Sequence, residues 1–274
     1  MTDFGLKVRM AVVGTILFGF YMLVATFALS VFGFGYWPIV GLGLLVLPAI
    51  QYKIGKWAAL RGAEPMPEEG QYQQIHFMTD KLSRKMGIDK PKLMVMDMGT
   101  PNAFATGRKG AGVVVVSTEL IRLLEKDELE GVIAHELAHI KNRDVVAMVI
   151  GSSIAMMVGY VAYFAVLMGG ERNIGTYVLA MAASMLANML VTVFVLAISR
   201  YREYVADDDA RQAIGAGDPL ARALEKISRG AEGRESNLDD SVSAMAIFNG
   251  DKGLMATLFA THPPAEKRIE KLRS

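Results

Sequence analysis

The 274-residue chain contains no cysteine. This absence excludes disulfide bonds, thiol nucleophiles and zinc sites with thiolate ligands, and it fits a protein that faces the cytoplasm. Without cysteine, any metal site must be built from carboxylate side chains and the four histidines of the chain. Its formal net charge is +1, from 29 Lys and Arg against 28 Asp and Glu, which gives no electrostatic reason to expect a nucleic-acid partner.

Charged side chains are absent from three long stretches, residues 10–52, 145–170 and 173–199. A bilayer core needs about 20 apolar residues per helix, so the last two stretches hold one span each and the first is long enough for two. Gly33 to Pro38 supply a turn and an aromatic anchor inside the first stretch. We therefore predict four transmembrane helices, near residues 10–31, 37–53, 145–168 and 174–199.

Two alternatives to these spans exist. Core helices of a soluble protein are also apolar all round, but they are usually shorter. A cleavable signal peptide is the alternative for the first stretch, because Lys7 and Arg9 precede it and Ala28-Leu29-Ser30 loosely suggests a cleavage site. The apolar region is too long for a signal peptide and continues into a second span, so we predict an uncleaved anchor.

Basic residues next to the spans indicate the orientation. The two loops on one side hold only Arg172, beside Glu171. Because lysine and arginine concentrate on the cytoplasmic side, we expect a multi-pass protein of the cell (inner or plasma) membrane with both termini and the polar segments in the cytoplasm. The basic residues on the other side are Lys7, Arg9, Lys53, Lys56, Arg61, Lys141, Arg143, Arg200 and Arg202.

The spans divide the chain into four segments. Residues 1–60 form one transmembrane hairpin and residues 145–199 the second. Residues 61–144 are expected to form a cytoplasmic part with a small sheet, and residues 200–274 a second cytoplasmic part. The motifs described below assign the catalytic function and the metal ligands to these two parts.

Within the first cytoplasmic part, the sequence predicts one helix and two strands. The helix has an apolar stripe from Ile75 to Met86 and ends at Gly87. The strands are residues 92–97 and 113–117, joined by a glycine-rich connection over residues 100–112.

The most informative motif is His135-Glu136-Leu137-Ala138-His139. Residues 126–134 before it are predicted as helix, since apolar residues recur at helical spacing and acidic residues lie near the start. Residues four apart share a helix face, so His135 and His139 can hold one metal ion while Glu136 lies beside the open coordination position. This arrangement is typical of a zinc hydrolase; the alternative is a chance pair of surface histidines.

A third ligand must come from His76, His262 or an acidic residue. His76 lies off the apolar stripe of its helix and is expected to be solvated. Glu203 and Asp207 follow the last span four residues apart, so one can bind the metal while the other accepts the free N–H of a ligand histidine. A charged face next to the membrane is the alternative, but the upstream motif favours Glu203 as the third ligand.

Both ligand-bearing helices are expected to run unbroken into membrane spans, because neither junction contains glycine or proline. At 1.5 Å per helical residue, the metal would then lie about 10 Å from the membrane face. The strand that contains Val113, Val114 and Val115 is expected to offer an edge along which a substrate peptide could lie by strand addition. Two buried structural strands are the alternative.

The metal motif and three further segments, residues 101–107, 199–207 and 261–269, resemble the HtpX-type membrane zinc endopeptidases. These are relatives of the prenyl-protein (CAAX) proteases. The likeness extends from the first span to the C-terminus. It implies a mainly α-helical integral membrane protein with a gluzincin-like zincin core, a small β-sheet and one zinc ion. It also implies hydrolysis of misfolded or damaged membrane proteins at the cytoplasmic face, as part of quality control under stress.

The resemblance also implies roles for individual residues. His135, His139 and Glu203 would be the zinc ligands. Glu136 would be the general base, and Asp207 a partner of a ligand histidine. Asn102 would lie near the bound substrate.

The tetrahedral oxyanion that forms during peptide hydrolysis needs a further hydrogen-bond donor. His262 and Arg268 are the candidates. The alternative is structural, with His262 in a turn and Arg268 on the face of a terminal helix.

Two other functions are compatible with parts of the sequence. A prenyl-protein processing protease would use the same chemistry, but the compact length and four spans argue against it. A channel, transporter or inactive scaffold is the non-enzymatic alternative, and charged or broken-helix sites would be expected inside its spans. The spans carry no charge, which argues against a transporter. The expected partners are membrane-protein or unfolded polypeptide substrates and the lipid bilayer.

Overall fold

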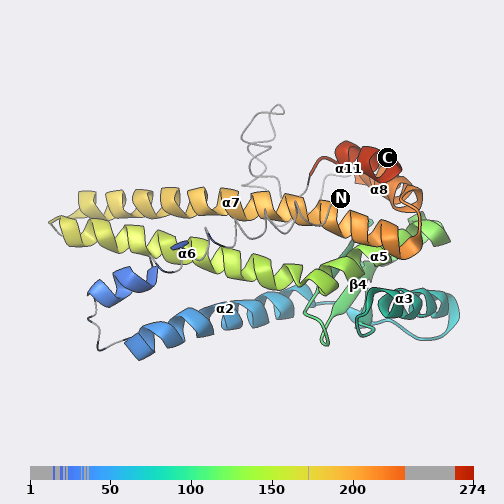
Figure 1. Cartoon of the computed structure of the whole chain (residues 1–274), viewed down its shortest axis with the longest axis horizontal. Coiled ribbons are helices and arrows are strands. Elements are labelled where there is room, and N and C mark those ends of the chain that lie inside the picture. The colour runs from blue at the N-terminus through green and yellow to red at the C-terminus, as the bar shows by residue number, and fades with distance from the viewer. Residues whose placement is uncertain are drawn as a thin grey trace. The chain divides into compact units, whose positions relative to one another are not determined.

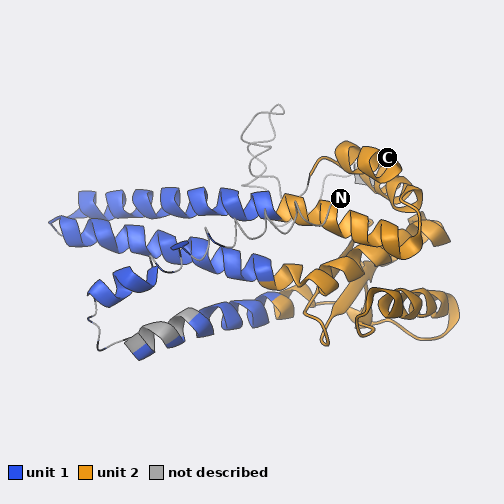
Figure 2. Ribbon diagram, viewed as in Figure 1, with its two compact units in different colours: residues 1–55, 147–198 blue, residues 56–146, 199–274 orange. Residues whose placement is uncertain are grey.

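The computed structural model describes residues 15, 19, 20, 22, 24–31, 33, 35, 37–171, 173–231 and 263–274. The chain divides into two compact units, each built from two segments of the sequence (Figure 2). Unit 1 comprises residues 1–55 and 147–198, and unit 2 comprises residues 56–146 and 199–274. The divisions expected after residues 60, 144 and 199 lie close to these boundaries.

Unit 1 consists of helical elements in its described part (Figure 1). Helix α2 (Trp37–Ala59) covers the second predicted span, and helices α6 (Asp144–Gly169) and α7 (Ile174–Ile214) cover the third and fourth. Among the described residues, two helices, α6 and α7, are long and apolar enough to cross a membrane. The first predicted span, residues 10–31, lies largely outside the described residues, so the number of four spans stays a prediction.

Helices α6 and α7 approach each other closely where small residues allow it. A Cβ atom added to Gly151 would lie 3.0 Å from the Val195 side chain, and one added to Gly159 would lie 3.2 Å from the Ser184 carbonyl oxygen. Close backbone approach through small residues is the usual packing of helices in lipid, where no hydrophobic effect drives association.

The junction between α5 and α6 corrects one expectation. Helix α5 (Lys126–Asn142) ends at Arg143, whose backbone is left-handed with φ 56°, and α6 begins at the next residue. The two helices are therefore not continuous, although no glycine or proline marks the break. Helix α7, by contrast, runs unbroken through the junction at Ser199, as expected.

A four-stranded sheet in unit 2 has the order β1-β2-β4-β3. Strands β2 (Lys92–Met96) and β4 (Val113–Ser117) are parallel, whereas β1 (Glu64–Pro65) pairs antiparallel with β2, and β3 (Ala103–Thr106) pairs antiparallel with β4. The two predicted strands are confirmed as β2 and β4. Strand β3 lies inside the residues expected to be a connection.

The sheet order overturns the substrate role expected for Val113, Val114 and Val115. Strand β4 is hydrogen-bonded to β2 on one side and to β3 on the other, and all three valines are buried. A strand that is paired on both sides has no free edge for a peptide to join. Among the described residues, the edge strand on this side of the sheet is β3 instead.

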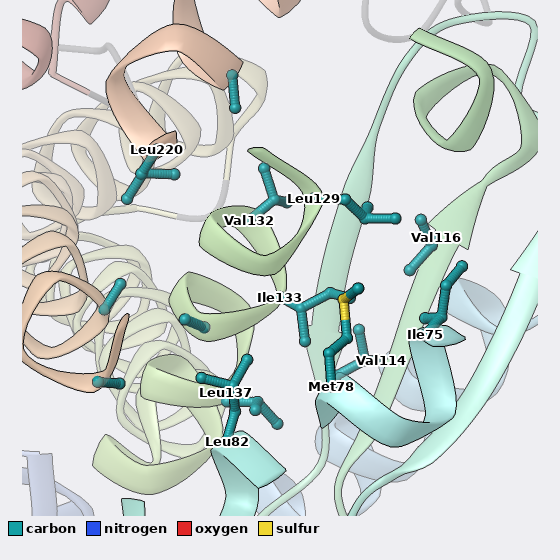
Figure 3. Packing of buried hydrophobic residues seen from close by; sticks show 14 of the residues in the cluster. Ile75, Met78, Leu82, Val114, Val116, Leu129, Val132, Ile133, Leu137 and Leu220 are labelled. Atoms are coloured by element: carbon teal, nitrogen blue, oxygen red, sulfur yellow. The ribbon is translucent and has the colours of Figure 1, made fainter. Parts of the chain in front are cut away.

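The core of unit 2 lies between the sheet and helices α3 (Gln73–Met86) and α5. Figure 3 shows Ile133 and Leu137 of α5 beside Met78 and Leu82 of α3. Val114 of β4 closes the same cluster. Burying such side chains contributes about 1.5–3 kcal/mol each, so this packing fixes the helix that carries the metal motif. Helix α3 ends at Gly87 with φ 69°, as the sequence predicts.

The remaining helices of unit 2 are the short η2 (Gly70–Tyr72), α4 (Thr118–Leu123), α8 (Asp218–Ala231) and α11 (Ala265–Arg273). Helix α11 packs against the start of α8, where a Cβ atom on Gly217 would lie 2.0 Å from the Leu272 carbonyl oxygen. Only glycine permits this approach. Arg273 adds an ion pair with Glu225 at 2.7 Å.

Glu128 fixes the start of α5. Its carboxylate accepts a hydrogen bond from the Glu125 N–H at 2.8 Å, which closes the first turn of the helix. The same carboxylate pairs with Lys226 Nζ at 2.8 Å and Arg222 Nε at 3.4 Å, both on α8. Burial opposes the ionisation of Glu128, but these partners hold the pKa of its carboxyl below the usual 4.5.

We predict that Glu128→Gln lowers the free energy of unfolding at pH 7 by about 2 kcal/mol, because hydrogen bonds to a charged group are lost. A carboxyl with a depressed folded-state pKa gives stability that is present above the unfolded-state pKa and is lost as the pH falls through the folded-state pKa. The difference from wild type should therefore shrink below about pH 4.5. Denaturant unfolding in detergent at neutral and acidic pH measures it.

The control is Glu130→Gln, which removes only the partly exposed partner of Lys81 at 3.5 Å and should change stability little. A Glu128→Gln difference that stays constant into acid would contradict the electrostatic explanation.

Candidate metal centre

Helix α5 carries three residues of the centre on buried positions. His135 and Glu136 are 6% and 8% exposed, and His139 is partly exposed one turn later. The imidazole Nε2 atoms of His135 and His139 lie 3.1 Å apart. The spacing of four residues therefore places both rings at one point on the helix surface, as the sequence predicts.

Glu203 of α7 completes a group of three. Its carboxylate oxygens lie 3.4 Å from His135 Nε2 and 3.6 Å from His139 Nε2. Bond lengths of 2.0–2.1 Å in a tetrahedral zinc site imply ligand atoms about 3.3–3.4 Å apart. The observed separations match this spacing, so His135, His139 and Glu203 form a group that could hold a metal ion.

The hydrogen bonds of the outer ring nitrogens assign the tautomers. His135 Nδ1 lies 3.0 Å from Asp207 Oδ1, and His139 Nδ1 lies 2.6 Å from Asp144 Oδ2. A carboxylate accepts a proton, so each Nδ1 carries the N–H and each Nε2 presents a lone pair. Two lone pairs that face each other at 3.1 Å repel unless a proton or a metal ion lies between them. The donor set therefore fits a metal ion.

Arg268 of α11 joins the two acidic residues of α7. Its Nε and terminal nitrogen contact the Asp207 carboxylate at 2.8 and 2.7 Å, and its other terminal nitrogen lies 3.0 Å from Glu203 Oε2. The guanidinium is buried, at 7% exposure. Such a bidentate pair fixes Asp207 in position, and Asp207 in turn fixes the ring of His135.

A second arginine has the same relation to the other histidine. Arg202 of α7 contacts Asp144, the partner of His139, and donates to the Asn142 carbonyl oxygen at 2.8 Å. The centre therefore contains the carboxylates of Glu136, Asp144, Glu203 and Asp207 against two guanidinium groups. The remaining two negative charges balance one divalent cation.

The surroundings shift the acid-base properties of the three α5 residues. Although burial opposes its charge, hydrogen bonds to Asp207 and Glu203 raise the pKa of His135 to about 9. Burial and the neighbouring His135 lower the pKa of His139 to about 4. At neutral pH the pair therefore holds one proton, which a metal ion would replace. Burial also raises the pKa of Glu136, which suits a proton acceptor.

The family model of peptidase family M48 matches residues 69–274 of the chain, which include every residue of this centre. The chain belongs to peptidase family M48. It is a metallopeptidase and thus a hydrolase. Its relatives include the protease HtpX homolog of Halobacterium salinarum, which is 52% identical over 97% of this chain and 100% of its own length. The protease HtpX homolog of Pyrococcus abyssi is 42% identical over 75% of this chain and 74% of its own length.

These relatives make the chain an M48 peptidase of the HtpX type, as the sequence motifs indicate. The crystal structure of S. mikatae Ste24p has a similar fold, with a TM-score of 0.59 at 18% identity, and the match covers 98% of this chain and 66% of that one. The M48 family is generally zinc-dependent, which agrees with the group of His135, His139 and Glu203.

The other residues expected at the site have different outcomes. Asn102 is exposed at the start of β3, where its N–H donates to Ser117 Oγ at 2.9 Å. Its contact with substrate stays a prediction. His262 lies outside the described residues. His76, 3.1 Å from the Met66 carbonyl oxygen, is only partly buried and is not part of the centre.

The sequence did not indicate Asp144 or Arg202. Both lie at the ends of predicted spans, where charged residues would be explained by the orientation of the protein in the membrane alone. The spacing of five residues between His139 and Asp144 gives no signal on a continuous helix. Their pairing depends on the helix break and on contact between distant segments.

We predict that Glu203→Ala loses bound zinc, because two imidazoles leave the ion with too few protein ligands. Glu136→Gln is the matched control at the same centre, and it should retain the metal because Glu136 is expected to act as a base and not as a ligand. Elemental analysis after zinc loading and gel filtration measures the metal content of both.

Stoichiometric zinc in Glu203→Ala would move the third ligand elsewhere, first to Asp207. Loss of zinc from Glu136→Gln would contradict the assignment of Glu136 as a base only.

Proposed function

We propose that this M48 peptidase is a zinc-dependent membrane endopeptidase that cuts extended segments of misfolded or damaged membrane proteins close to the cytoplasmic face of the cell membrane. The observation that carries the proposal is the convergence of three metal-ligand atoms beside Glu136 and the edge strand β3. One zinc ion per chain is the expected cofactor. The protein would act in quality control, as the HtpX resemblance implies.

The residues of the centre suit peptide hydrolysis. When bound by His135, His139 and Glu203, zinc supplies a Lewis acid for the peptide carbonyl and lowers the pKa of water towards about 7. Glu136 takes the proton from the attacking water and passes it to the leaving amine. Its raised pKa lets it hold that proton between the two steps.

Arg268 was expected to stabilise the oxyanion, and its geometry supports a different role. All three guanidinium nitrogens lie against Asp207 or Glu203. Arg268 would therefore hold the two carboxylates in place and supply positive charge near the metal. His262 stays the other candidate for the oxyanion donor.

Strand β3 is the proposed substrate edge. The Asn102 carbonyl oxygen accepts a hydrogen bond from the Ser117 N–H at 2.9 Å, so the backbone groups of Asn102 face β4. Because these groups alternate along an antiparallel strand, those of Ala103 and Ala105 face the opposite side. The backbone of Ala105 accordingly lies near the Glu136 carboxyl group, where it acts to lower the pKa of Glu136 against the larger effect of burial. An extended peptide added at Ala103 would pass beside the general base.

The apolar surface of α6 and α7 supports a location in the bilayer. In the most apolar part of α7 only 11% of residues are buried, and in α6 33%. A core helix of a soluble protein would be mostly buried. Large apolar side chains are exposed along both helices, and lipid is the partner that would cover them: Phe164, Met168, Leu179, Met185 and Leu190.

The position of Glu203 on α7 relates the site to the membrane. Helix α7 continues unbroken from the predicted span into the centre, and Glu203 lies four residues beyond Ser199. At 1.5 Å per residue this places the ligand roughly 6 Å past the end of the span. The basic flanks Lys56, Arg200 and Arg202 support a cytoplasmic location for this end of the span.

We predict that the protein in proteoliposomes cuts unfolded segments within about 10–20 residues of a substrate's own span, because the active site is held near the bilayer. Rigid helical spacers inserted between the span and the segment should reduce cutting progressively. Mass spectrometry of the products gives both the cleavage sites and the rates.

Glu136→Gln is the inactive control and should cut no member of the series. A soluble unfolded protein, assayed in parallel, separates the two parts of the proposal. Equal cutting at every spacer length would refute the membrane-proximal site, and no cutting of any substrate by the zinc-loaded protein would refute the peptidase itself.

A further inference from the structure

Asp144 and Arg202 form a pair that nothing in the reaction scheme uses. Both side chains are buried, at 6% exposure each. One oxygen of Asp144 contacts Arg202, and the other lies 2.6 Å from His139 Nδ1. Arg202 also donates to the Asn142 carbonyl oxygen at 2.8 Å, so it is fastened to the last turn of α5.

This pair repeats the arrangement at the other histidine. There, His135 Nδ1 contacts Asp207, and Asp207 is held by Arg268. At each ligand histidine, the ring N–H donates to a carboxylate, and an arginine fixes that carboxylate. The carboxylates and arginines come from different elements, since Asp207 and Arg268 lie on α7 and α11 whereas Asp144 is the first residue of α6.

We propose that Asp144 and Arg202 are positioning residues of the metal centre, which hold the Nδ1–H tautomer and the orientation of His139. The inference rests on the proposed metal-dependent function. Asp144 and Arg202 would hold His139 in the same way that Asp207 and Arg268 hold His135.

The break at Arg143 makes this contact possible. On a continuous helix, residues five apart point about 140° away from each other, so Asp144 could not face His139. Arg143 is instead left-handed, and its N–H bonds back to the Ile140 carbonyl oxygen at 3.2 Å. It is the one residue other than glycine with positive φ in the described part of the chain. This less favourable conformation turns Asp144 back towards His139.

Two adjacent residues of α7 serve metal binding and the orientation of His139. Glu203 faces the metal position, and Arg202 before it reaches the carboxylate behind His139. The metal geometry therefore depends on how the turn of α7 that carries Arg202 and Glu203 meets the start of α6. Both contacts lie within unit 2.

The test compares zinc affinity, by competition with a chromophoric chelator, for the full-length wild type and Asp144→Asn in detergent. Substitution of a residue that orients a metal ligand typically weakens binding 10 to 100-fold, and we expect this loss for Asp144→Asn. Cobalt(II) substituted for zinc should show an altered visible spectrum in the variant, because the orientation of one ligand changes.

The matched control is Asp209→Asn. Asp209 also joins the end of α5 to α7, through Lys141 at 2.7 Å and Asn142 at 2.8 Å, but it contacts no ligand histidine. If Asp144 and Asp209 were equally structural, both variants would lose thermal stability and neither would change metal affinity. We expect altered affinity and an altered cobalt spectrum only for Asp144→Asn.

Arg202 is tested through its coupling to Asp144. Arg202→Met should weaken zinc binding in the wild-type background but have little further effect beside Asp144→Ala, since it acts through that carboxylate. The double variant Asp144→Ala/Arg202→Met also avoids an unpaired buried charge, so it stays informative if the Asp144→Ala protein does not fold.

Unchanged zinc affinity and cobalt spectrum in a folded Asp144→Asn protein would overturn the inference. So would full additivity of the Asp144 and Arg202 effects. Failure of the wild type itself to bind zinc is a different outcome, and it would refute the metal-dependent function on which the inference rests.

Discussion

The metal centre of unit 2 is built around one electrostatic constraint, the repulsion between two imidazole lone pairs held 3.1 Å apart in a buried site. Asp144 and Asp207 bind the outer nitrogens of these rings and so direct the inner nitrogens towards each other. Glu203 adds a carboxylate at the same point. A cation between the two rings removes this repulsion. A metal ion bound there would therefore stabilise unit 2.

Charge neutrality explains why the surrounding elements converge there. Four buried carboxylates would repel one another without positive charges nearby. Two arginines neutralise half of this negative charge. Arg268 comes from the C-terminal helix, which is closed onto α8 at Gly217 and Leu272. The C-terminal residues thereby complete a site whose ligands lie far earlier in the chain. Removal of that helix would leave Asp207 and Glu203 without their shared partner.

Much of the centre follows from local sequence, because helical spacing of four residues acts over short range. The pair His135 and His139, and the pair Glu203 and Asp207, each share a face of one helix, and the structure brings the two pairs together. The helix end at Gly87 is likewise local, since glycine accepts the left-handed conformation at little cost. Strands β2 and β4 were also predictable, from their runs of apolar residues.

The features that escaped prediction depend on contacts between distant residues. Strand β3 consists largely of small residues, Ala103 and Ala105 among them, and lacks the β-branched pattern that marks a strand. Without β3, the predicted sheet ends at the strand of Val113, Val114 and Val115. In the structure that strand is interior. The break at Arg143 has no glycine or proline to announce it. Its cause is tertiary, because the turn lets Asp144 meet His139 and Arg202.

The central claim is that the two imidazoles and Glu203 enclose one divalent ion. X-ray absorption at the zinc edge of the purified wild-type protein measures this environment directly. The structure predicts one zinc per chain, with two imidazole nitrogens at about 2.0–2.1 Å and oxygen donors completing the shell. A shell with a single imidazole or with oxygen donors alone, or protein that takes up no stoichiometric zinc, would contradict the account.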